Sequence, residues 1–345
     1  MDIPFVFGKI ADGEDFTDRV LDTEKLKNNF RGLVNTIIIS PRRWGKTSLV
    51  NHALEQMRDD KEYLVCKVDI FNCRTEAQFY QTYVNAILKA SYTKMDEFIE
   101  AKNKLYSYDE ILDLPQKIAL EKGKKFIVCI DEFQNVSSYD DSLGFQRKLR
   151  SHWQTHNRVG YCMFGSKRHM LLDIFSNYEM PFYKFGDIMF LDKIGEEDWV
   201  KFIVSRFADT GKKISESVAR LITQKVDSHP YYVQQLSQLA WLRSKKMCEA
   251  SIVDEAFESL VGQLSLLFSN LVDSLTAKQI SFLQAVAYGE KNFSSREVLT
   301  KYQLGTSANI KNLKKAMQDK DLIDVMPDAI TLQDPIFAYW LKEKY

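Results

Sequence analysis

Short apolar runs alternate with amphipathic helical patterns over the first half of the chain. Runs rich in β-branched and aromatic residues predict strands at residues 36–39, 63–70, 126–130, 160–164 and 185–191. Apolar residues at helical spacing predict helices at 23–30, 48–57, 143–155 and 167–175, and a long helical region at 75–121 with room for one break. This alternation predicts an α/β fold, in which a parallel sheet carries helices on both faces.

The pattern becomes helical only from residue 196 to about 270. Helices are expected at 196–209, 215–227, 231–246 and 252–268, which together predict a small helical domain. Beyond it the sequence predicts short helices at 276–289, 294–302 and 306–318, strands at 322–325 and 329–332 around a turn at 326–328, and a last helix at 335–341. Three short helices and a hairpin are typical of a winged helix-turn-helix. The predicted domains are residues 1–192, 193–270 and 271–345.

The first predicted strand leads directly into a turn with a recognisable ending. Residues 37–49 read Ile-Ile-Ile-Ser-Pro-Arg-Arg-Trp-Gly-Lys-Thr-Ser-Leu, so Gly45-Lys46-Thr47 stands at the start of a helix. That order is typical of a phosphate-binding loop, where backbone N–H groups and the positive end of the helix converge on phosphates. Lys46 would place a positive charge near the β- and γ-phosphates of a nucleotide, and the Thr47 hydroxyl would hold Mg²⁺.

The loop departs from the usual pattern at Ser40, where G-x-x-x-x-G-K-[ST] has its first glycine. Glycine is favoured there because the backbone turns tightly, but serine is small and also tolerates turns. The alternative is a chance Gly-Lys-Thr in a surface loop. The strand before it, the helix after it and an acidic motif downstream favour phosphate binding. The residues predicted to contact nucleotide are Ser40, Pro41, Arg42, Arg43, Trp44, Gly45, Lys46, Thr47 and Ser48.

The acidic motif is Asp131-Glu132, which follows directly after the apolar run at 126–130. Ligand-binding groups of α/β sheets lie at the carboxyl ends of the strands. Asp131 is therefore expected to hold Mg²⁺ opposite Thr47, and Glu132 to polarise the attacking water as general base. The alternative is a solvated polar pair that caps the next element. The phosphate-binding loop upstream favours the catalytic interpretation.

Two further stretches supply candidates near the phosphates. Ser166 follows a predicted strand, from which its hydroxyl would lie beside the γ-phosphate. Lys167 and Arg168 are cations at a helix start, an unfavourable place unless an anion is near, although a solvated basic turn explains them equally well. Pro230 stands at the start of a predicted helix. Proline is common at this position, so Pro230 has either this ordinary structural role or a contact with nucleotide.

Composition narrows the classes of function. The chain has 345 residues, and Lys+Arg and Asp+Glu both number 47, so the formal net charge is zero. Whole-chain charge therefore argues for neither nucleic acid nor an anionic membrane, and DNA binding would need a local basic face. The five cysteines form no C-x-x-C pair, which fits a reducing cytosol. No apolar run approaches the roughly 20 residues of a membrane helix. The N-terminus lacks a basic and then apolar segment, so we expect a cytoplasmic protein that does not contact a membrane.

Four stretches carry a resemblance to known proteins. They are residues 40–49, Ile130-Asp131-Glu132-Phe133-Gln134, Phe164-Gly165-Ser166-Lys167-Arg168 and His229-Pro230-Tyr231-Tyr232. Together they resemble the archaeal-type ATPase family of AAA+ and STAND-like P-loop NTPases, and the similarity covers essentially the whole chain. The resemblance implies a core that binds ATP and Mg²⁺, a helical lid at 193–270 and a C-terminal winged helix.

The same resemblance implies roles for single residues. Ser166 corresponds to the first sensor, and Pro230 to the lid proline that contacts nucleotide. Where family members carry an arginine after Pro-Phe-Tyr, this chain has Lys184, so Arg168 and Lys184 are both candidates for the arginine that acts in trans. The lid also lacks the Gly-x-x-Arg second sensor of many AAA+ proteins, which implies slow hydrolysis or a nucleotide-gated switch. The predicted catalytic residues are Glu132, Lys46, Ser166 and Arg168.

The predicted helix at 306–318 is the candidate for contact with DNA. Ile310, Leu313 and Met317 recur at helical spacing and predict one buried stripe. This leaves a polar face of Ser307, Asn309, Lys311, Asn312, Lys314 and Lys315. Asn and Lys are competent for base and phosphate contacts, but exposed lysines on a helix are usually a solvated face. Packing on the ATPase core or on a protein partner is the alternative.

Two classes of function follow. The first is an ATPase whose nucleotide state switches domain arrangement, homo-oligomeric assembly or the binding of a protein partner. The second is an ATP-dependent DNA-binding regulator, or a loader of the replication or transposition type. A degenerate pseudo-ATPase is disfavoured because Lys46, Thr47, Asp131 and Glu132 are all intact.

Overall fold

The computed structural model describes residues 3–326 and 328–345, and it divides into two compact units. One unit is Asp12–Asp192, and the other comprises Lys193–Tyr345 together with the described residues up to Ala11. The hydrophobic cores follow this division, since among the described residues each core cluster takes its buried members from a single unit. The finer division into domains at 1–192, 193–270 and 271–345 stays a prediction.

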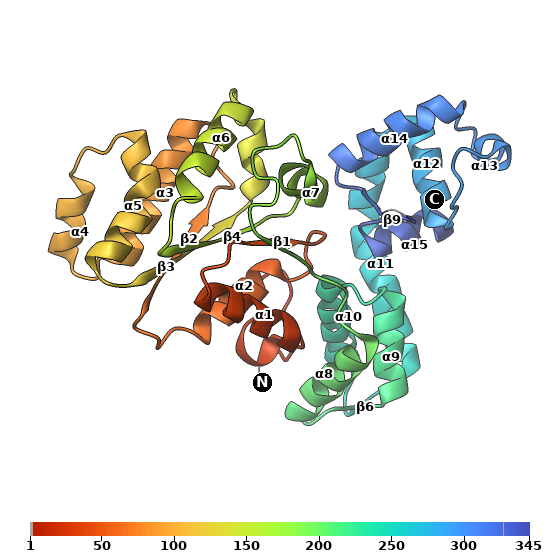
Figure 1. Ribbon diagram of the computed structural model, residues 1–345. Coiled ribbons are helices and arrows are strands. Elements are labelled where there is room, and N and C mark those ends of the chain that lie inside the picture. Colours follow the sequence, from red (N-terminus) through yellow and green to blue (C-terminus); the bar gives the residue numbers. More distant parts are fainter. Residues whose placement is uncertain (1–2, 327) are drawn as a thin grey trace. The chain divides into compact units, whose positions relative to one another are not determined.

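A five-stranded parallel sheet forms the centre of the unit Asp12–Asp192 (Figure 1). The strands are β1 Thr36–Ile39, β2 Tyr63–Asp69, β3 Lys125–Asp131, β4 Val159–Phe164 and β5 Asp187–Phe190. Their order is β2-β3-β4-β1-β5, and each neighbouring pair is parallel. The predicted strands and the α/β fold class are confirmed. Because β1, β3 and β4 are neighbours that end at the same edge, the segments that follow them come together there.

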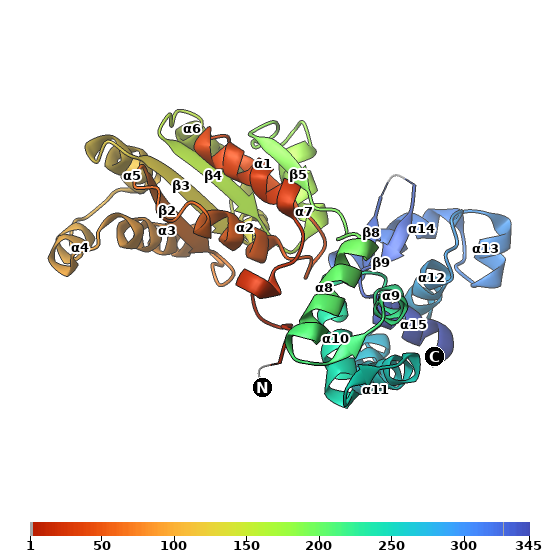
Figure 2. The ribbon, with the colours of Figure 1, turned by 90° about the horizontal axis from the view of Figure 1, so that it is seen from below.

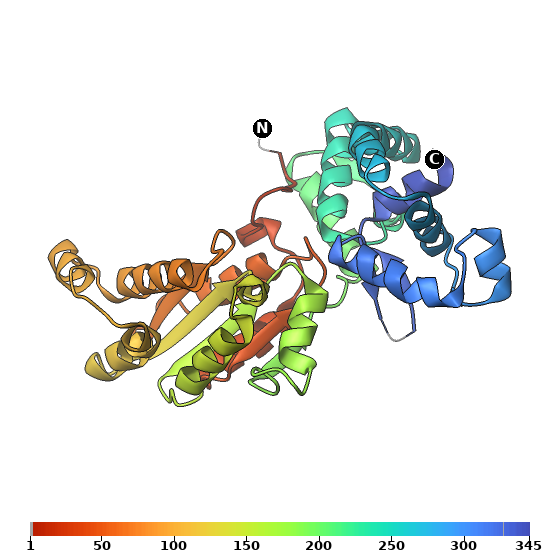
Figure 3. The ribbon, with the colours of Figure 1, turned by 90° about the horizontal axis from the view of Figure 1, so that it is seen from above.

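Helices cover both faces of this sheet. On one face lie α1 Val20–Arg31 and α2 Lys46–Glu55, which Figure 2 shows against the strands. On the other lie α3 Glu76–Ser91, α4 Met95–Lys102, α5 Tyr108–Glu121, α6 Ser142–Trp153 and α7 Arg168–Ser176 (Figure 3). Successive strand residues serve opposite cores: Ile37 and Ile39 pack with the second set, and Ile38 with the first. A strand must be apolar at every position to fill two cores, which explains the uninterrupted apolar runs.

The long helical region predicted at 75–121 is in fact three helices. The last of them, α5, begins at a capping box, in which the Ser107 hydroxyl accepts from the Glu110 N–H at 3.3 Å. The Glu110 carboxylate in turn accepts from the Ser107 N–H at 2.8 Å. Both bonds satisfy N–H groups that a helix start leaves unpaired, so a new helix begins here instead of one helix continuing.

The second unit begins with four helices, α8 Glu196–Asp209, α9 Glu216–Lys225, α10 Pro230–Arg243 and α11 Ala250–Asp273. The prediction that this region is helical only was wrong, because Lys213–Ile214 (β6) pairs in parallel with Met247–Cys248 (β7). Two-residue strands are too short to show a period of two in the sequence. The N-terminal segment packs here as well: Phe5 contacts Phe207 with ring centroids 5.6 Å apart, whereas the predicted core domain began at residue 1.

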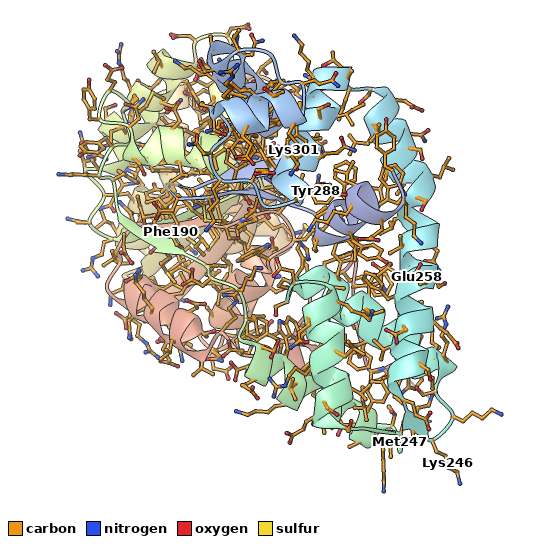
Figure 4. All side chains as sticks on the ribbon, turned by 90° about the vertical axis from the view of Figure 1, so that its right-hand side faces the viewer. Phe190, Lys246, Met247, Glu258, Tyr288 and Lys301 are labelled. Atoms are coloured by element: carbon orange, nitrogen blue, oxygen red, sulfur yellow. The ribbon has the colours of Figure 1, made fainter. Side chains whose placement is uncertain are left out.

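The winged-helix elements follow in the predicted order. They are α12 Ala277–Ala287, α13 Arg296–Lys301, α14 Ser307–Asp319, β8 Ile323–Val325, β9 Ile330–Leu332 and α15 Pro335–Glu343. β8 and β9 are antiparallel, as a wing requires. Of the turn predicted between them, Pro327 lies outside the described residues. Glu258 on α11, labelled in Figure 4, accepts from the Tyr339 hydroxyl at 3.0 Å and pairs with Lys344 at 3.3 Å, which ties α11 to α15.

Among the helices of the described residues, none is both long and apolar enough to cross a bilayer.

Candidate functional site

The loop between β1 and α2 wraps around a buried ammonium group. Lys46, the first residue of α2, is 7% exposed. Its Nζ donates to the backbone oxygen of Ser40 at 3.1 Å, to the Ser40 hydroxyl at 3.1 Å and to the backbone oxygen of Pro41 at 2.8 Å. Burial of a charge is costly unless hydrogen bonds compensate for the lost water. The loop is therefore folded around this positive charge.

The missing first glycine has a structural explanation. The positive φ angles of this loop are at Arg43 (64°) and Gly45 (88°), not at Ser40. Ser40 therefore needs no glycine for its backbone conformation. Its side chain is 1% exposed and contributes an acceptor to Lys46. Serine here adds a contact that glycine could not make.

Thr47 and Asp131 face each other across the sheet edge. The Thr47 hydroxyl donates to Asp131 Oδ2 at 3.2 Å, and the Glu132 N–H donates to Oδ1 at 2.8 Å. Burial, and then the nearby charge of Glu132, raise the pKa of Asp131 to about 6, although these two hydrogen bonds oppose the shift. A buried carboxylate with so little compensation favours a nearby cation.

These two side chains are the residues that could hold a divalent cation. A hydroxyl and a carboxylate oxygen are ligands that Mg²⁺ accepts, usually beside several waters and substrate phosphates. Within the described residues, no group of three or more His, Cys, Asp or Glu could hold a metal ion. The donor set therefore fits an ion that is bound jointly with a phosphate ligand, and it does not fit an all-protein cage.

Glu132 is held between the ends of β3 and β4. Its φ is 57°, in the left-handed region that non-glycine residues seldom occupy. Its Oε2 accepts from the Ser166 hydroxyl at 2.9 Å and from the Ser166 N–H at 3.4 Å, and Gln134 Nε2 donates to the same oxygen. The predicted first-sensor residue therefore contacts the predicted base directly. Gln134, which the sequence indicated only as part of a motif, helps to orient it.

The other candidates are placed less specifically. Arg42 and Arg43 are exposed on the loop, and Trp44 is half-buried. Arg168 is the first residue of α7, whose first turn contains no acidic side chain. Lys184 is exposed, with its Nζ 5.3 Å from the ring centroid of Tyr183. The choice between Arg168 and Lys184 as the trans-acting cation stays open.

Two further candidates complete the set. Ser48 is 9% exposed in the first turn of α2. Pro230 is the first residue of α10 and follows the N-cap His229, as predicted for a helix start. It belongs to the second unit, so its contact with nucleotide stays a prediction.

One site residue was missed by sequence reasoning. Arg19 directly precedes α1 as its N-cap residue, but its side chain makes no capping bond. It is 6% exposed and donates to the backbone oxygens of Asp192 at 2.8 Å and Trp44 at 3.3 Å. Backbone carbonyls occur at every residue, so no sequence signal marks these acceptors.

The polar face of α14 contrasts with this buried site. Ile310, Leu313 and Met317 are buried, which confirms the predicted stripe. Lys311 and Lys315 are exposed. Beside the start of α14 is a pocket of about 470 Å³, lined by Ser294, Arg296, Leu299, Thr300, Gln303, Gly305 and Ser307. The arrangement offers cations and polar groups on one exposed surface of the winged helix.

Comparisons with solved structures identify the fold. A Walker-type ATPase of Pyrococcus abyssi is 17% identical with a TM-score of 0.75, over 98% of this chain and 99% of that chain. The ORC2 protein of Aeropyrum pernix, solved in ADPNP and ADP complexes, is 15% identical with a TM-score of 0.63, over 98% and 96%. The Aeropyrum pernix ORC1 protein in complex with DNA is 11% identical with a TM-score of 0.52, over 96% and 94%.

Sequence comparisons add one local match. A family model described as a probable winged helix domain matches residues 266–343. Curated protein sequences give no match. The chain thus has the fold of archaeal Walker-type and ORC/Cdc6-type AAA+ ATPases, with a winged helix at its C-terminal end, as the sequence predicted. At these identities the likeness concerns the fold alone.

Proposed function

We propose that this chain binds ATP at the loop 40–47 and hydrolyses it slowly, and that the nucleotide state switches domain arrangement, assembly or partner binding. The observation that carries the proposal is the 3.2 Å contact of Thr47 Oγ1 with Asp131 Oδ2, next to the buried ammonium of Lys46. A hydroxyl, a carboxylate and an ammonium at a helix N-terminus are the groups that a Mg²⁺–triphosphate requires.

The residues of the loop would bind the phosphates. Backbone N–H groups of the loop and the start of α2 donate to phosphate oxygens, and Lys46 exchanges loop carbonyls for the β- and γ-phosphates. Thr47 and Asp131 would hold Mg²⁺, which supplies polarisation of the phosphate oxygens when bound. Fold similarity to a protein solved with ADPNP and ADP supports nucleotide as the ligand.

Glu132 would accept a proton from the water that attacks the γ-phosphorus. A general base must be aimed at this water, and contacts from Ser166 and Gln134 hold the carboxylate in one orientation. Both contacts use Oε2, which leaves Oε1 as the oxygen for the water. Hydrolysis would be slow because no second-sensor arginine is identified and the trans-acting cation must come from a neighbouring copy.

The decisive experiment measures ATP binding and turnover for the parent, Lys46→Ala and Glu132→Gln. Lys46→Ala should lose binding by about a hundredfold, since it removes a buried charge together with the phosphate contact. Glu132→Gln should bind normally and turn over about 10²- to 10⁴-fold more slowly, because an amide cannot accept the proton. Fluorescence titration and phosphate release measure the two quantities.

Lys61→Ala is a suitable control, since this lysine is exposed on the turn before β2. It should leave both quantities unchanged. A parent that binds no nucleotide would refute the proposal as a whole. Normal turnover by Glu132→Gln would refute only the assignment of the base.

A second candidate function is ATP-dependent DNA binding by the winged helix. The exposed Lys311 and Lys315 on α14 favour it, as does the likeness in fold to an ORC1 protein solved in complex with DNA. Against it stands negative charge in the same part of the chain, since Asp319 at the end of α14 and Asp328 between β8 and β9 are both exposed. Binding to duplex DNA as a function of salt decides between the candidates.

A further inference from the structure

A buried arginine links three separate parts of the unit Asp12–Asp192. Arg19 Nη1 donates to the backbone oxygen of Asp192 at 2.8 Å and to Asp22 Oδ2 at 3.1 Å, and Nη2 donates to the backbone oxygen of Trp44 at 3.3 Å. The guanidinium carries five donors in a rigid planar fork, so it can hold several acceptors in one geometry. A lysine could not hold these three in the same way.

The contact with Trp44 controls a donor of the phosphate-binding loop. The Trp44 carbonyl belongs to the same peptide group as the Gly45 N–H, and in a planar trans peptide the two bonds point in opposite directions. A donor on the carbonyl therefore sets the direction of the Gly45 N–H. This amide is among those that a phosphate-binding loop turns toward phosphate.

The contact with Asp192 lies where the chain leaves this unit, since Lys193 begins the next one. One residue earlier, the Leu191 N–H donates to the backbone oxygen of Ile39 at 3.1 Å. Residues 191–192 are therefore joined to both ends of the loop, directly to Ile39 and through Arg19 to Trp44. Trp44 cannot move relative to Ile39 without displacing the exit segment or breaking one of these bonds.

The backbone at Arg19 is held in an unfavourable conformation. Asp18 has a φ of 53° and Arg19 a φ of 67°, two consecutive non-glycine residues in the left-handed region. Such conformations persist only where the surroundings enforce them, and they cluster at ligand clamps and switches. A helix start alone does not require them, because ordinary N-cap residues have extended backbone.

We propose that Arg19 is a positioning residue that couples the phosphate-binding loop to the segment through which the chain enters the second unit. The inference rests on the proposed function, because the event transmitted is nucleotide binding at the loop. Turning the Gly45 amide onto a phosphate moves the Trp44 carbonyl. The shared guanidinium passes this displacement to Asp192, and from there the second unit is reoriented.

The test uses the full chain with one spin label in each unit, introduced at Glu121→Cys on α5 and Glu255→Cys on α11. Both positions are exposed and the five native cysteines are buried, so the new thiols are labelled selectively. The distance between labels is measured with and without a saturating non-hydrolysable ATP analogue. Affinity is measured with a fluorescent form of the same analogue. The variants are Arg19→Met and Arg19→Lys.

Arg31→Met is the matched control, because Arg31 is an exposed arginine in the last turn of α1, the helix that Arg19 precedes. We expect the parent and this control to show the same nucleotide-dependent change in distance. Arg19→Met should bind about tenfold more weakly, as expected for the loss of one charge-assisted hydrogen bond. Once saturated, it should show no change in distance. Arg19→Lys should keep most of the affinity and also lose the change in distance.

The outcomes separate this inference from the proposed function. A parent that binds no nucleotide refutes both. A parent that binds without any change in distance, or a saturated Arg19→Met that changes as the parent does, refutes the coupling alone. If thermal unfolding shows that Arg19→Met does not fold, the same comparison is made with Arg19→Lys, which keeps the buried charge.

Discussion

The two surfaces proposed to contact ligands differ in whether their lysines are buried or exposed. In the unit Asp12–Asp192, Lys46 is 7% exposed and its ammonium donates to Ser40 and Pro41 at 2.8–3.1 Å. On α14, Lys311 and Lys315 are exposed on the polar face. The conformation of the loop therefore depends on Lys46, whereas the fold of the winged helix does not depend on Lys311 or Lys315.

This difference in burial determines what a substitution at each surface should change. Burial of an ammonium group has a cost that only a matching set of acceptors offsets, so the loop's conformation and its charge depend on each other. An exposed lysine keeps its hydration and has no desolvation penalty, and such lysines are common on the helices of soluble proteins whatever their function. Substitutions at the first site should therefore change both the free energy of unfolding and the chemistry. Substitutions on α14 should change binding alone.

Gly165→Ala should have the largest effect. A Cβ at this position would lie 1.8 Å from Gln134 Oε1 and 3.2 Å from the Cα of Glu132. The Gln134 amide, which is 1% exposed, would have to move and release the Glu132 carboxylate. We expect a loss of about 1–3 kcal/mol in the free energy of unfolding. ATP turnover should fall on the order of tenfold or more through misplacement of the base. Urea unfolding and phosphate release measure the two effects.

Gly262→Ala is the control from the second unit. Gly262 lies within α11, and a Cβ there would meet no atom within 4 Å. Alanine loses less backbone entropy than glycine on folding, so the free energy of unfolding of this variant should rise by up to about 1 kcal/mol. Its ATP turnover should not change. Equal effects of the two substitutions would show that the close packing at Gly165 is unimportant.

Asp131→Asn should have an effect that depends on pH. Burial raises the pKa of Asp131 to about 6, so the folded state holds this proton to a higher pH than the unfolded chain. Asp131 therefore stabilises the fold fully at low pH and loses this contribution as pH rises through 6. Asparagine has no proton to lose, so the variant should be more stable than the parent by about 1–3 kcal/mol at pH 8, and not at pH 4. Urea unfolding across this range gives the difference.

Asp187→Asn supplies a control of opposite sign. Burial raises the pKa of Asp187, but hydrogen bonds from Lys25 and Asn29 outweigh it and hold the pKa below its ordinary value. This carboxylate stabilises the fold above its unfolded pKa and loses that contribution in acid. Its asparagine variant should therefore be less stable than the parent at pH 8. The same sign for both variants would contradict the account of Asp131.

The buried site could be predicted from the sequence only where strand order brings motifs together. Thr47 lies just after β1 and Asp131 is the last residue of β3, and a parallel sheet places the ends of its strands at one edge. Their proximity was therefore expected from the predicted parallel strands together with the phosphate-binding motif and the acidic pair. The chemical roles assigned to Thr47 and Asp131 stay predictions, which measurements of ATP binding and turnover would test.

Other features carried no usable signal. Arg19 bonds to backbone oxygens, one of which is 173 residues away, and such acceptors have no residue type to recognise. The constraint on Gly165 exists only because β3 and β4 are neighbours and bring Gln134 against it. The β6–β7 pair has two residues in each strand, too few for periodicity to detect. Long-range contacts of this kind need the folded structure.

Reversal of charge on α14 should have the smallest effect on folding. Lys311→Glu with Lys315→Glu should change the free energy of unfolding by less than about 0.5 kcal/mol, as is usual for exposed positions. If the winged helix contacts DNA, duplex affinity should fall and its dependence on log salt should become shallower by about two. Fluorescence anisotropy over a salt series measures both.

The control must alter net charge equally, because any lost lysine weakens non-specific attraction to DNA. Lys245→Glu with Lys246→Glu meets this requirement, since both residues are exposed and directly precede β7. Lys246 is labelled in Figure 4. If the two double variants lose equal affinity, α14 has no special role and the interaction is general charge attraction. If only the α14 variant loses affinity, the exposed face of α14 binds DNA although its lysines do not contribute to the stability of the fold. Burial of a lysine is then no guide to function in that unit.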